Sequence, residues 1–174
     1  MSNKKTIDEL EVLTPDQLGK LLIAEVIKNV SPDVRYIQDL LTVGCPIDIR
    51  ANNGMTALHK AARYEKLEVV KLLISKGADI EARSNSGWTA LHWAAGNDHI
   101  EISEYLIHSG VELDSRDIWG WTALHYAVLD GYLHTVKLLI SKGADIEARN
   151  DAGNIAWDFA TRETREAIPE LEPK

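Results

Sequence analysis

A single sequence frame returns every 33 residues and organises most of this chain of 174 residues. The frame, Gly-x-Thr-Ala-Leu-His, begins at Gly54, Gly87 and Gly120, and it fades in a fourth copy that begins at Gly153. A second landmark keeps the same period without an insertion, at Gly44, Gly77, Gly110 and Gly143. A fixed period of this length predicts a stack of small, similar units, each covering the apolar face of its neighbour. Such a stack presents an extended surface, so function should be sought on that surface.

The composition narrows the classes of function. With 45% hydrophobic and 26% charged residues, the chain has the composition of a folded, soluble protein. Its formal net charge of −8 argues against general binding to nucleic acid or anionic membranes, which requires clustered positive charge. No apolar stretch approaches the roughly 20 residues needed to span a bilayer, and the segment Met1 to Glu9 has no apolar secretion core. We therefore expect a cytoplasmic protein, with the nucleus or delivery into a host cell as alternatives.

Within each copy the pattern predicts a short helix, a turn and a longer helix. The short helix begins at the threonine of the frame, and the longer one carries apolar residues at helical spacing, as at Leu67, Val70 and Leu73. A glycine follows each longer helix, as a left-handed C-terminal cap requires. Before the first full copy, Thr6 and Thr14 each stand three residues before a glutamate or glutamine, which is the spacing of a capping box.

These landmarks together resemble the ankyrin repeat. The resemblance rests on Thr-Ala-Leu-His, on the alanine pairs that follow it, and on a Val-x-x-Leu-Leu stretch before Gly-Ala-Asp, and it covers roughly residues 18 to 168. Two features depart from the family pattern. Alanine replaces the usual proline at Ala57, Ala90 and Ala123, and the turn glycine between the two helices occurs only at Gly131, with Glu65 and Asp98 in the other copies. Both departures slightly weaken helix starts and turns and leave the fold prediction intact.

The resemblance implies an all-α ankyrin solenoid of stacked helix-turn-helix units with projecting hairpin-like arms. We predict an N-terminal extension (1–13), a degenerate N-terminal capping repeat (14–50), three ankyrin repeats (51–83, 84–116 and 117–149), a truncated C-terminal capping repeat (150–168) and a tail (169–174). Degenerate end units are expected because an end repeat has one face in water. Pro169 closes the last helix, so we expect the tail to be disordered.

Three histidines, His59, His92 and His125, recur once per repeat and raise the question of a metal or acid–base site. A whole structural unit separates neighbouring histidines, and no Cys, His or Asp spacing converges on a zinc site. In ankyrin repeats this histidine hydrogen-bonds near its own threonine and steadies the turn. We therefore favour the structural role and predict no metal.

An arginine also recurs once per unit, two residues after an acid. The arginines are Arg50, Arg83, Arg116 and Arg149, and the acids are Asp48, Glu81, Asp114 and Glu147. Residues two apart in an extended segment point the same way, so we expect each acid beside its arginine. The arginine stripe either grips an acidic or phosphorylated partner or forms a self-satisfied surface network. We favour the network.

The variable positions supply the candidate partner-binding residues. The resemblance implies that partners meet the arm tips and the exposed side of the short helices. The apolar candidates there are Met55, Trp88, Trp119 and Trp121, and the polar candidates are Arg63, Tyr64, Asn97 and Asp130. Exposed tryptophans commonly anchor interfaces; the alternative is that the indoles pack on neighbouring arms and stabilise the stack. On the anchor hypothesis, replacing Trp88 and Trp121 by alanine leaves folding nearly intact.

No constellation of residues suggests catalysis. The chain has no phosphate-binding glycine loop, no Gly-x-Ser-x-Gly and no His-Glu-x-x-His, and its single cysteine, Cys45, occupies a small position where we expect it to be buried and inert. We predict a non-enzymatic module without a cofactor that binds another protein on a concave face of arms and short helices, as an inhibitor or adaptor. The alternatives are a microbial effector or regulatory subunit using the same face, and a self-associating structural array; we expect a monomer rather than a homodimer.

Overall fold

The computed structural model describes residues 4–28 and 31–173. Residues 1–3 of the predicted extension and residue 174 of the predicted tail lie outside it. The elements are α1 (Ile7–Glu11), α2 (Pro15–Val26), α3 (Val34–Thr42), α4 (Ala57–Arg63), α5 (Leu67–Ser75), α6 (Ala90–Ala95), α7 (Ile100–His108), α8 (Ala123–Leu129), α9 (Leu133–Ser141) and α10 (Arg162–Ala167), with 3₁₀ turns η1 (Ala156–Phe159) and η2 (Pro169–Leu171). Every regular element in this described part is helical, which confirms the predicted all-α class.

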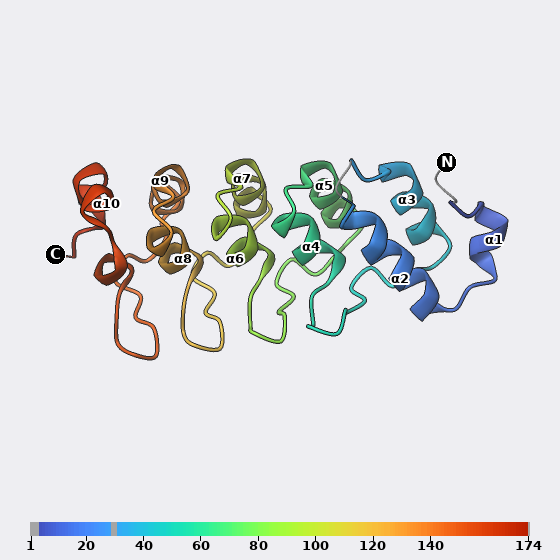
Figure 1. The fold of residues 1–174 in the computed structure, drawn as a ribbon, viewed down its shortest axis with the longest axis horizontal. Helices are drawn as coiled ribbons and strands as arrows, with labels where there is room; N and C mark the ends of the chain where they lie inside the picture. Colours follow the sequence, from blue (N-terminus) through green and yellow to red (C-terminus); the bar gives the residue numbers. More distant parts are fainter. Residues whose placement is uncertain (1–3, 29–30, 174) are drawn as a thin grey trace.

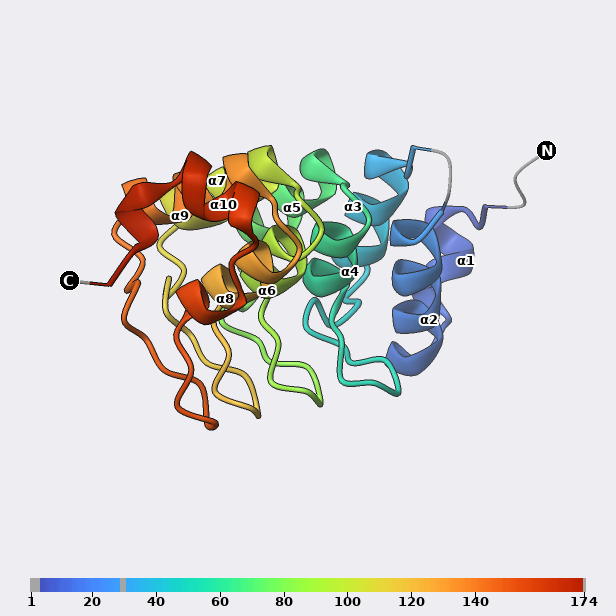
Figure 2. The same ribbon diagram turned by 60° about the vertical axis from the view of Figure 1, so that its left-hand side comes forward.

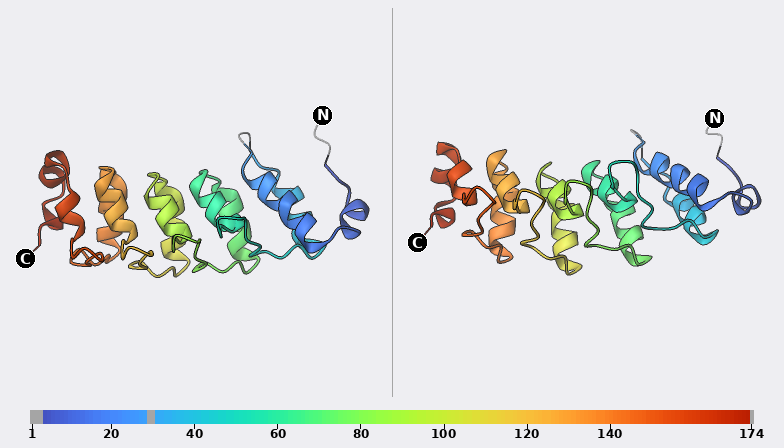
Figure 3. Two further views of the ribbon diagram at one scale, coloured as in Figure 1. Left: turned by 60° about the horizontal axis from the view of Figure 1, so that its bottom comes forward. Right: turned by 90° about the horizontal axis from the view of Figure 1, so that it is seen from below.

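The helices form two rows along an elongated stack (Figure 1). The inner row consists of α2, α4, α6, α8 and η1, each in contact with the next, and α3, α5, α7 and α9 form the outer row in the same way. Between the units, extended loops project to one side of the inner row (Figure 2), and the units follow one another along the long axis (Figure 3). This is the solenoid that the 33-residue period predicts. The unit boundaries given above stay a prediction.

Small residues on the inner row and leucines on the outer row explain the stacking. Ala61 and Ala94 are fully buried, so neighbouring short helices approach closely, and Leu73 and Leu106 are fully buried on the longer helices. The apolar core is continuous from Leu10 in α1 to the C-terminal end of the stack. Each unit therefore depends on its neighbours for burial, as expected for a repeat protein.

Each short helix begins with the same threonine–histidine pair, which confirms the structural role of the repeated histidine. The backbone N–H of Thr56 donates to Nδ1 of His59 over 3.1 Å, and the Thr56 hydroxyl lies 2.9 Å from the same nitrogen. Because Nδ1 accepts, Nε2 carries the proton and donates to the carbonyl of Trp88 over 2.8 Å. The histidine thus ties its own helix start to the next unit, and His92 and His125 repeat the arrangement.

The projecting loops are hairpin-like, and we name them arms 1 to 4: residues 49–55, 82–88, 115–121 and 148–154. In arm 1, Ala51 N–H donates to the carbonyl of Met55 and Gly54 N–H donates to the carbonyl of Ala51, which closes a tight turn. Neighbouring arms are also tied together, since Ile118 N–H of arm 3 donates to the Ser86 carbonyl of arm 2 over 3.2 Å. A β-carbon on the turn glycine Gly87 would lie 2.9 Å from the Ile118 nitrogen, so this close approach requires glycine.

The repeated arginines do not sit beside their acids as expected. Arg50 donates to the carbonyl of Gly54 in its own arm and to the carbonyl of Arg83 in the next arm. The acid Asp48 instead accepts from the backbone N–H of Asp79 in the next unit, at 3.1 Å. The expectation of an acid–arginine ladder was wrong because unpaired backbone groups of the next arm lie within reach and require partners. The arginine stripe is still satisfied within the molecule, mainly by backbone carbonyls, with Arg116 also pairing with the Asp151 carboxylate at 3.3 Å.

The two ends of the stack are covered by apolar side chains. At the N-terminal end, Thr14 and Gln17 form the predicted capping box, with Thr14 N–H donating to Gln17 Oε1 over 2.9 Å. At the C-terminal end, Leu171 is fully buried within η2, so the predicted disorder of the tail was wrong for its first residues. Leu171 packs inward because the last unit exposes an apolar face that only the following chain covers. Cys45 is buried as predicted, and burial raises its pKa to about 11.

The turn between α4 and α5 stores backbone strain that a substitution can release. Glu65 has φ of 56° in this turn, at the position where Gly131 stands two units later. We expect Glu65→Gly to raise the free energy of unfolding by about 0.5–1 kcal/mol, because glycine adopts this conformation without steric cost.

The equivalent Asp98 also has positive φ, at 57°, but its carboxylate accepts from the buried Thr135 hydroxyl over 2.7 Å. Asp98→Gly should therefore lose about 1 kcal/mol in urea denaturation. A gain for both variants would contradict this explanation.

Candidate partner-binding surface

The predicted anchor Met55 is not on the surface. Its side chain is 1% exposed, so it contributes to packing and is unavailable to a partner. The methionine side chain is flexible and has no strong polar atom that needs a hydrogen bond. It can therefore be fully buried at a position where the larger indole of a tryptophan stays partly exposed. The prediction of Met55 as an exposed anchor was therefore wrong.

The tryptophans Trp88 and Trp121 belong to an aromatic row that crosses three units. The row consists of Trp93, Trp88, Tyr126, Trp121 and Phe159, all half-buried. Successive ring centroids along it are 4.4, 4.4, 5.0 and 4.6 Å apart. Contacts of this kind contribute about 0.5–1.5 kcal/mol each beyond the area they bury. Within the described residues, the one buried polar side-chain atom without a hydrogen-bond partner is Trp93 Nε1.

Asp117, at the base of arm 3, organises the middle of the aromatic row. Its Oδ2 accepts from Trp88 Nε1 over 3.1 Å and from the Tyr126 hydroxyl over 2.6 Å. Its Oδ1 accepts from the backbone N–H groups of Trp119 and Trp121, both at 2.9 Å. Asp117 is 8% exposed, and desolvation together with the hydrogen bond to Asp117 raises the pKa of Tyr126. One side chain therefore fixes two rings and the turn of the arm together.

These contacts favour packing over partner binding for Trp88 and Trp121. Both rings contact a tilted aromatic ring on either side, and the Trp88 indole N–H is already bonded to Asp117. The expectation that alanine at both positions leaves folding nearly intact is therefore replaced. We now expect that double variant to be strongly destabilised, because removing buried aromatic area from a core costs several kcal/mol.

Two exposed clusters flank the aromatic row. The tip cluster, at the turn of arm 3, consists of Ile118 and Trp119, which are 56% and 53% exposed. The helix-end cluster lies where the short helices end and consists of Tyr64 (41% exposed), Leu129 (45% exposed), Arg63, Asn97 and Asp130. The Arg63 guanidinium lies over the Trp93 ring at 4.8 Å and beside the Tyr64 ring at 5.4 Å. Trp93, at one end of the aromatic row, and the exposed Tyr64 thus hold the Arg63 guanidinium in place.

The comparisons with protein-family models agree with this architecture. A model described as ankyrin repeats in three copies matches residues 22–117, and a single ankyrin-repeat model matches residues 119–151. The chain belongs to the ankyrin-repeat family. Among curated proteins, no sequence matches this chain. Ankyrin repeats are generally protein–protein interaction modules, and ankyrin-repeat proteins are typically non-enzymatic.

Over residues 4–28 and 31–173, no group of three or more His, Cys, Asp or Glu side chains could hold a metal ion. In the same described ranges, no helix combines the length and apolar character needed to cross a bilayer.

Ile118 and Leu129 lie at a predicted arm tip and a predicted short-helix end but were not among the predicted partner-binding residues, although a signal was present. At the position of Ile118 the other ankyrin arms carry Asn52, Asn85 and Asp151, and at that of Leu129 the other repeats carry Arg63 and Gly96. An aliphatic residue that replaces polar or small ones at an exposed repeat position has no stacking role to explain it. That comparison within the chain would have found both.

Proposed function

We propose that this ankyrin-repeat protein binds another protein, without catalysis, on the face formed by the arms and short helices, and thereby acts as an inhibitor or adaptor. The observation that carries the proposal is the pair of exposed apolar clusters on either side of an ordered aromatic row. Tyr64 and Trp119 are the side chains best suited to anchor a partner, since tyrosine, tryptophan and arginine dominate binding energy at interfaces.

The rigidity of the aromatic row supports this function. Trp88, Tyr126 and Trp121 are locked by mutual stacking and by Asp117, and Arg63 is held by Trp93. A surface whose side chains are already ordered loses little conformational entropy on binding. The favourable binding free energy of the exposed anchors is therefore not offset by a large loss of conformational entropy.

The charges around the helix-end cluster indicate the kind of partner. The cluster itself contains the exposed Asp130, the exposed acidic residues Glu65 and Asp98 follow the ends of α4 and α6, and the whole chain carries a formal net charge of −8. A partner surface that is apolar at its centre and positively charged at its rim would complement this arrangement. The opposite charges would also speed its association. We infer a partner of that character.

Affinity capture with matched variants tests the proposal. We expect the helix-end variant (Tyr64→Ser with Leu129→Ser) and the tip variant (Ile118→Ser with Trp119→Ser) each to retain at least about tenfold less partner than the wild type, because they remove apolar anchors. Both should unfold within about 0.5 kcal/mol of the wild type, since these side chains are exposed. Val12→Ser is the control, because Val12 is 81% exposed at the end of α1, away from this face.

Two outcomes would overturn the proposal. A partner that both variants retain as well as the wild type does would place binding elsewhere. A wild-type chain that captures nothing but sediments as a dimer, which the tip or helix-end variant abolishes, would show that the face serves self-association.

A further inference from the structure

The four arms pair with one another in a fixed pattern. In each step from one arm to the next, a backbone N–H of the following arm donates to a carbonyl of the preceding arm, at 3.0–3.2 Å. These donors and acceptors are Asn85 with Asn53, Ile118 with Ser86, and Asp151 with Trp119. In each step an arginine of the preceding arm also donates to an arginine carbonyl of the following one: Arg50 to Arg83, Arg83 to Arg116, and Arg116 to Arg149. We call the edge of an arm that faces the preceding arm its leading edge. The groups that pair with a leading edge are therefore seen in three successive pairs of arms.

Arm 1 has no arm before it, and its leading edge is open. Among the described residues, no group pairs with the Asn52 N–H or the Arg50 carbonyl, which are the equivalents of the bonded groups in arms 2 to 4. A third position on this edge, which carries a backbone donor in the other units, has no N–H in the first unit. The N–H groups of Asp79, Glu112 and Asp145 donate to acids of the preceding unit, whereas the equivalent residue of the first unit is Pro46, which has no N–H. Of the three equivalent backbone positions on this edge, the described structure thus leaves the Asn52 N–H and the Arg50 carbonyl without a partner.

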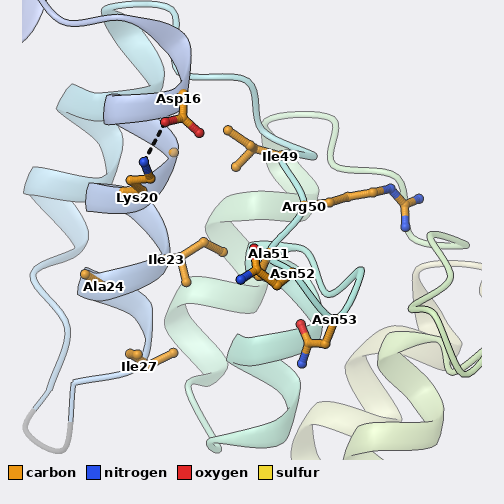
Figure 4. A pocket seen from close by; sticks show the side chains of 11 residues that line it. Asp16, Lys20, Ile23, Ala24, Ile27, Ile49, Arg50, Ala51, Asn52 and Asn53 are labelled. Carbon is orange, nitrogen blue, oxygen red and sulfur yellow. Dashed lines mark ion pairs between the residues drawn. The ribbon is translucent and has the colours of Figure 1, made fainter.

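An apolar groove lies beside this open edge (Figure 4). Its volume is about 480 Å³, and it separates α2 from residues 49–53 of arm 1. Ile23 and Ala24 of α2 and Ile27, which caps the end of α2, form one wall, and Ile27 is 41% exposed. Asp16 and Lys20 lie at the rim, where both side chains are exposed, and they pair with each other at 2.7 Å. The groove thus combines an apolar wall with an unpaired backbone edge, the two features of sites that bind extended peptides by strand addition.

We propose that an extended, arginine-containing segment of a protein partner binds in this groove and continues the arm row. Its arginine donates to the Arg50 carbonyl, a main-chain carbonyl three residues later accepts from the Asn52 N–H, and an aliphatic side chain packs against Ile23 and Ile27. The three-residue interval follows from the internal arms, in which Arg83 precedes Ser86 and Arg116 precedes Trp119.

A second copy of the chain fits this site less well. The last arm of another copy would carry the required arginine, Arg149, but that arm directly precedes η1 and α10 of its own capping unit. Continuing the row would place those elements where α2 and α3 already stand. A separate peptide segment carries no such unit. The site lies apart from the tip and helix-end clusters, so its failure would leave the proposed function standing.

A peptide titration followed by NMR of the full chain tests the site. The probe is a blocked synthetic peptide with the sequence of residues 80–90, which supplies Ile80, Arg83 and Ser86 in the required order. We expect saturable shifts of the Asn52 amide and of the Ile23 and Ile27 methyl groups, with slower exchange of the Asn52 amide proton. A matched peptide carrying Arg83→Gln should bind about tenfold more weakly, because it loses a charge-assisted hydrogen bond.

Asn52→Pro removes the backbone donor with little effect on the fold. Asn52 follows Ala51 in the closed turn of arm 1, a position that proline suits. We expect Asn52→Pro to weaken peptide binding about tenfold and the control Asn52→Ala, which keeps the N–H, to bind as the wild type does. Unfolding curves of both variants establish that they fold. Shifts confined to other arms, equal binding by Asn52→Pro and Asn52→Ala, no saturable binding at millimolar peptide, or self-association that Asn52→Pro abolishes would each overturn the proposal.

Discussion

Asp117→Ala is expected to lower the free energy of unfolding by about 3 kcal/mol, a large effect for a single residue of a loop. The side chain accepts four hydrogen bonds, from Trp88 Nε1, the Tyr126 hydroxyl and the backbone of Trp119 and Trp121, and it is 8% exposed. Its removal leaves several donors without an acceptor in a half-buried site, and each such group costs on the order of 1 kcal/mol. Urea denaturation followed by tryptophan fluorescence measures the loss.

The chain offers a matched control for this prediction at the same position of the next arm. Asn150 accepts only from two backbone groups, Ala152 N–H and Asn154 N–H, both at 3.0 Å. Asn150→Ala should therefore cost about 1–1.5 kcal/mol, at most half of the effect at Asp117. Equal losses at the two positions would mean that the turn bonds, and not the bonds to the aromatic rings, carry the effect of Asp117.

The second large effect is loss of stability in mild acid. Burial lowers the pKa of His92 to about 4 and also lowers the pKa values of His59 and His125. A histidine whose folded pKa lies below the unfolded value of about 6.5 binds more protons when unfolded, so its contribution is fully present above pH 6.5 and is lost as the pH falls toward the folded pKa. For His92 alone we expect about 2 kcal/mol to be lost between pH 7 and pH 5. The other two histidines act in the same direction.

His92→Gln isolates this effect. Glutamine three residues after Thr89 keeps the capping-box arrangement while removing the titrating group. Unfolding free energies of wild type and variant, measured by urea denaturation from pH 7 to pH 5, should converge as the pH falls, because only the wild type carries the His92 term. Parallel curves over the whole range would show that protonation of His92 is not a source of the acid sensitivity.

The repeat architecture was predictable because it is written in local, periodic signals. The threonine and histidine of each frame form their pair within four residues, as Thr56 and His59 do, so the sequence alone specifies the bond. Glycine landmarks and apolar spacing fix the helices in the same local way. These features depend little on what lies one unit away.

Side-chain exposure on the arms was harder to predict because it depends on the neighbouring unit. The positions of Met55 and Trp88 are equivalent in the repeat, yet Met55 is 1% exposed and Trp88 stacks between Trp93 and Tyr126 at the surface. The role of Asp117 was equally hidden, because the equivalent residues Ala51 and Ser84 give no sign of a carboxylate that bonds two rings. Contacts between repeats decide these cases, and a single period does not reveal them.

Hydrogen–deuterium exchange of the wild-type chain with and without its captured partner tests most directly which face binds. We predict slower amide exchange on binding at the turn of arm 3 and at the ends of α4, α6 and α8, where the tip and helix-end clusters lie. The outer helices α5, α7 and α9 should exchange at unchanged rates. Slower exchange in those outer helices, with no change in the arms and short helices, would contradict binding on the proposed face.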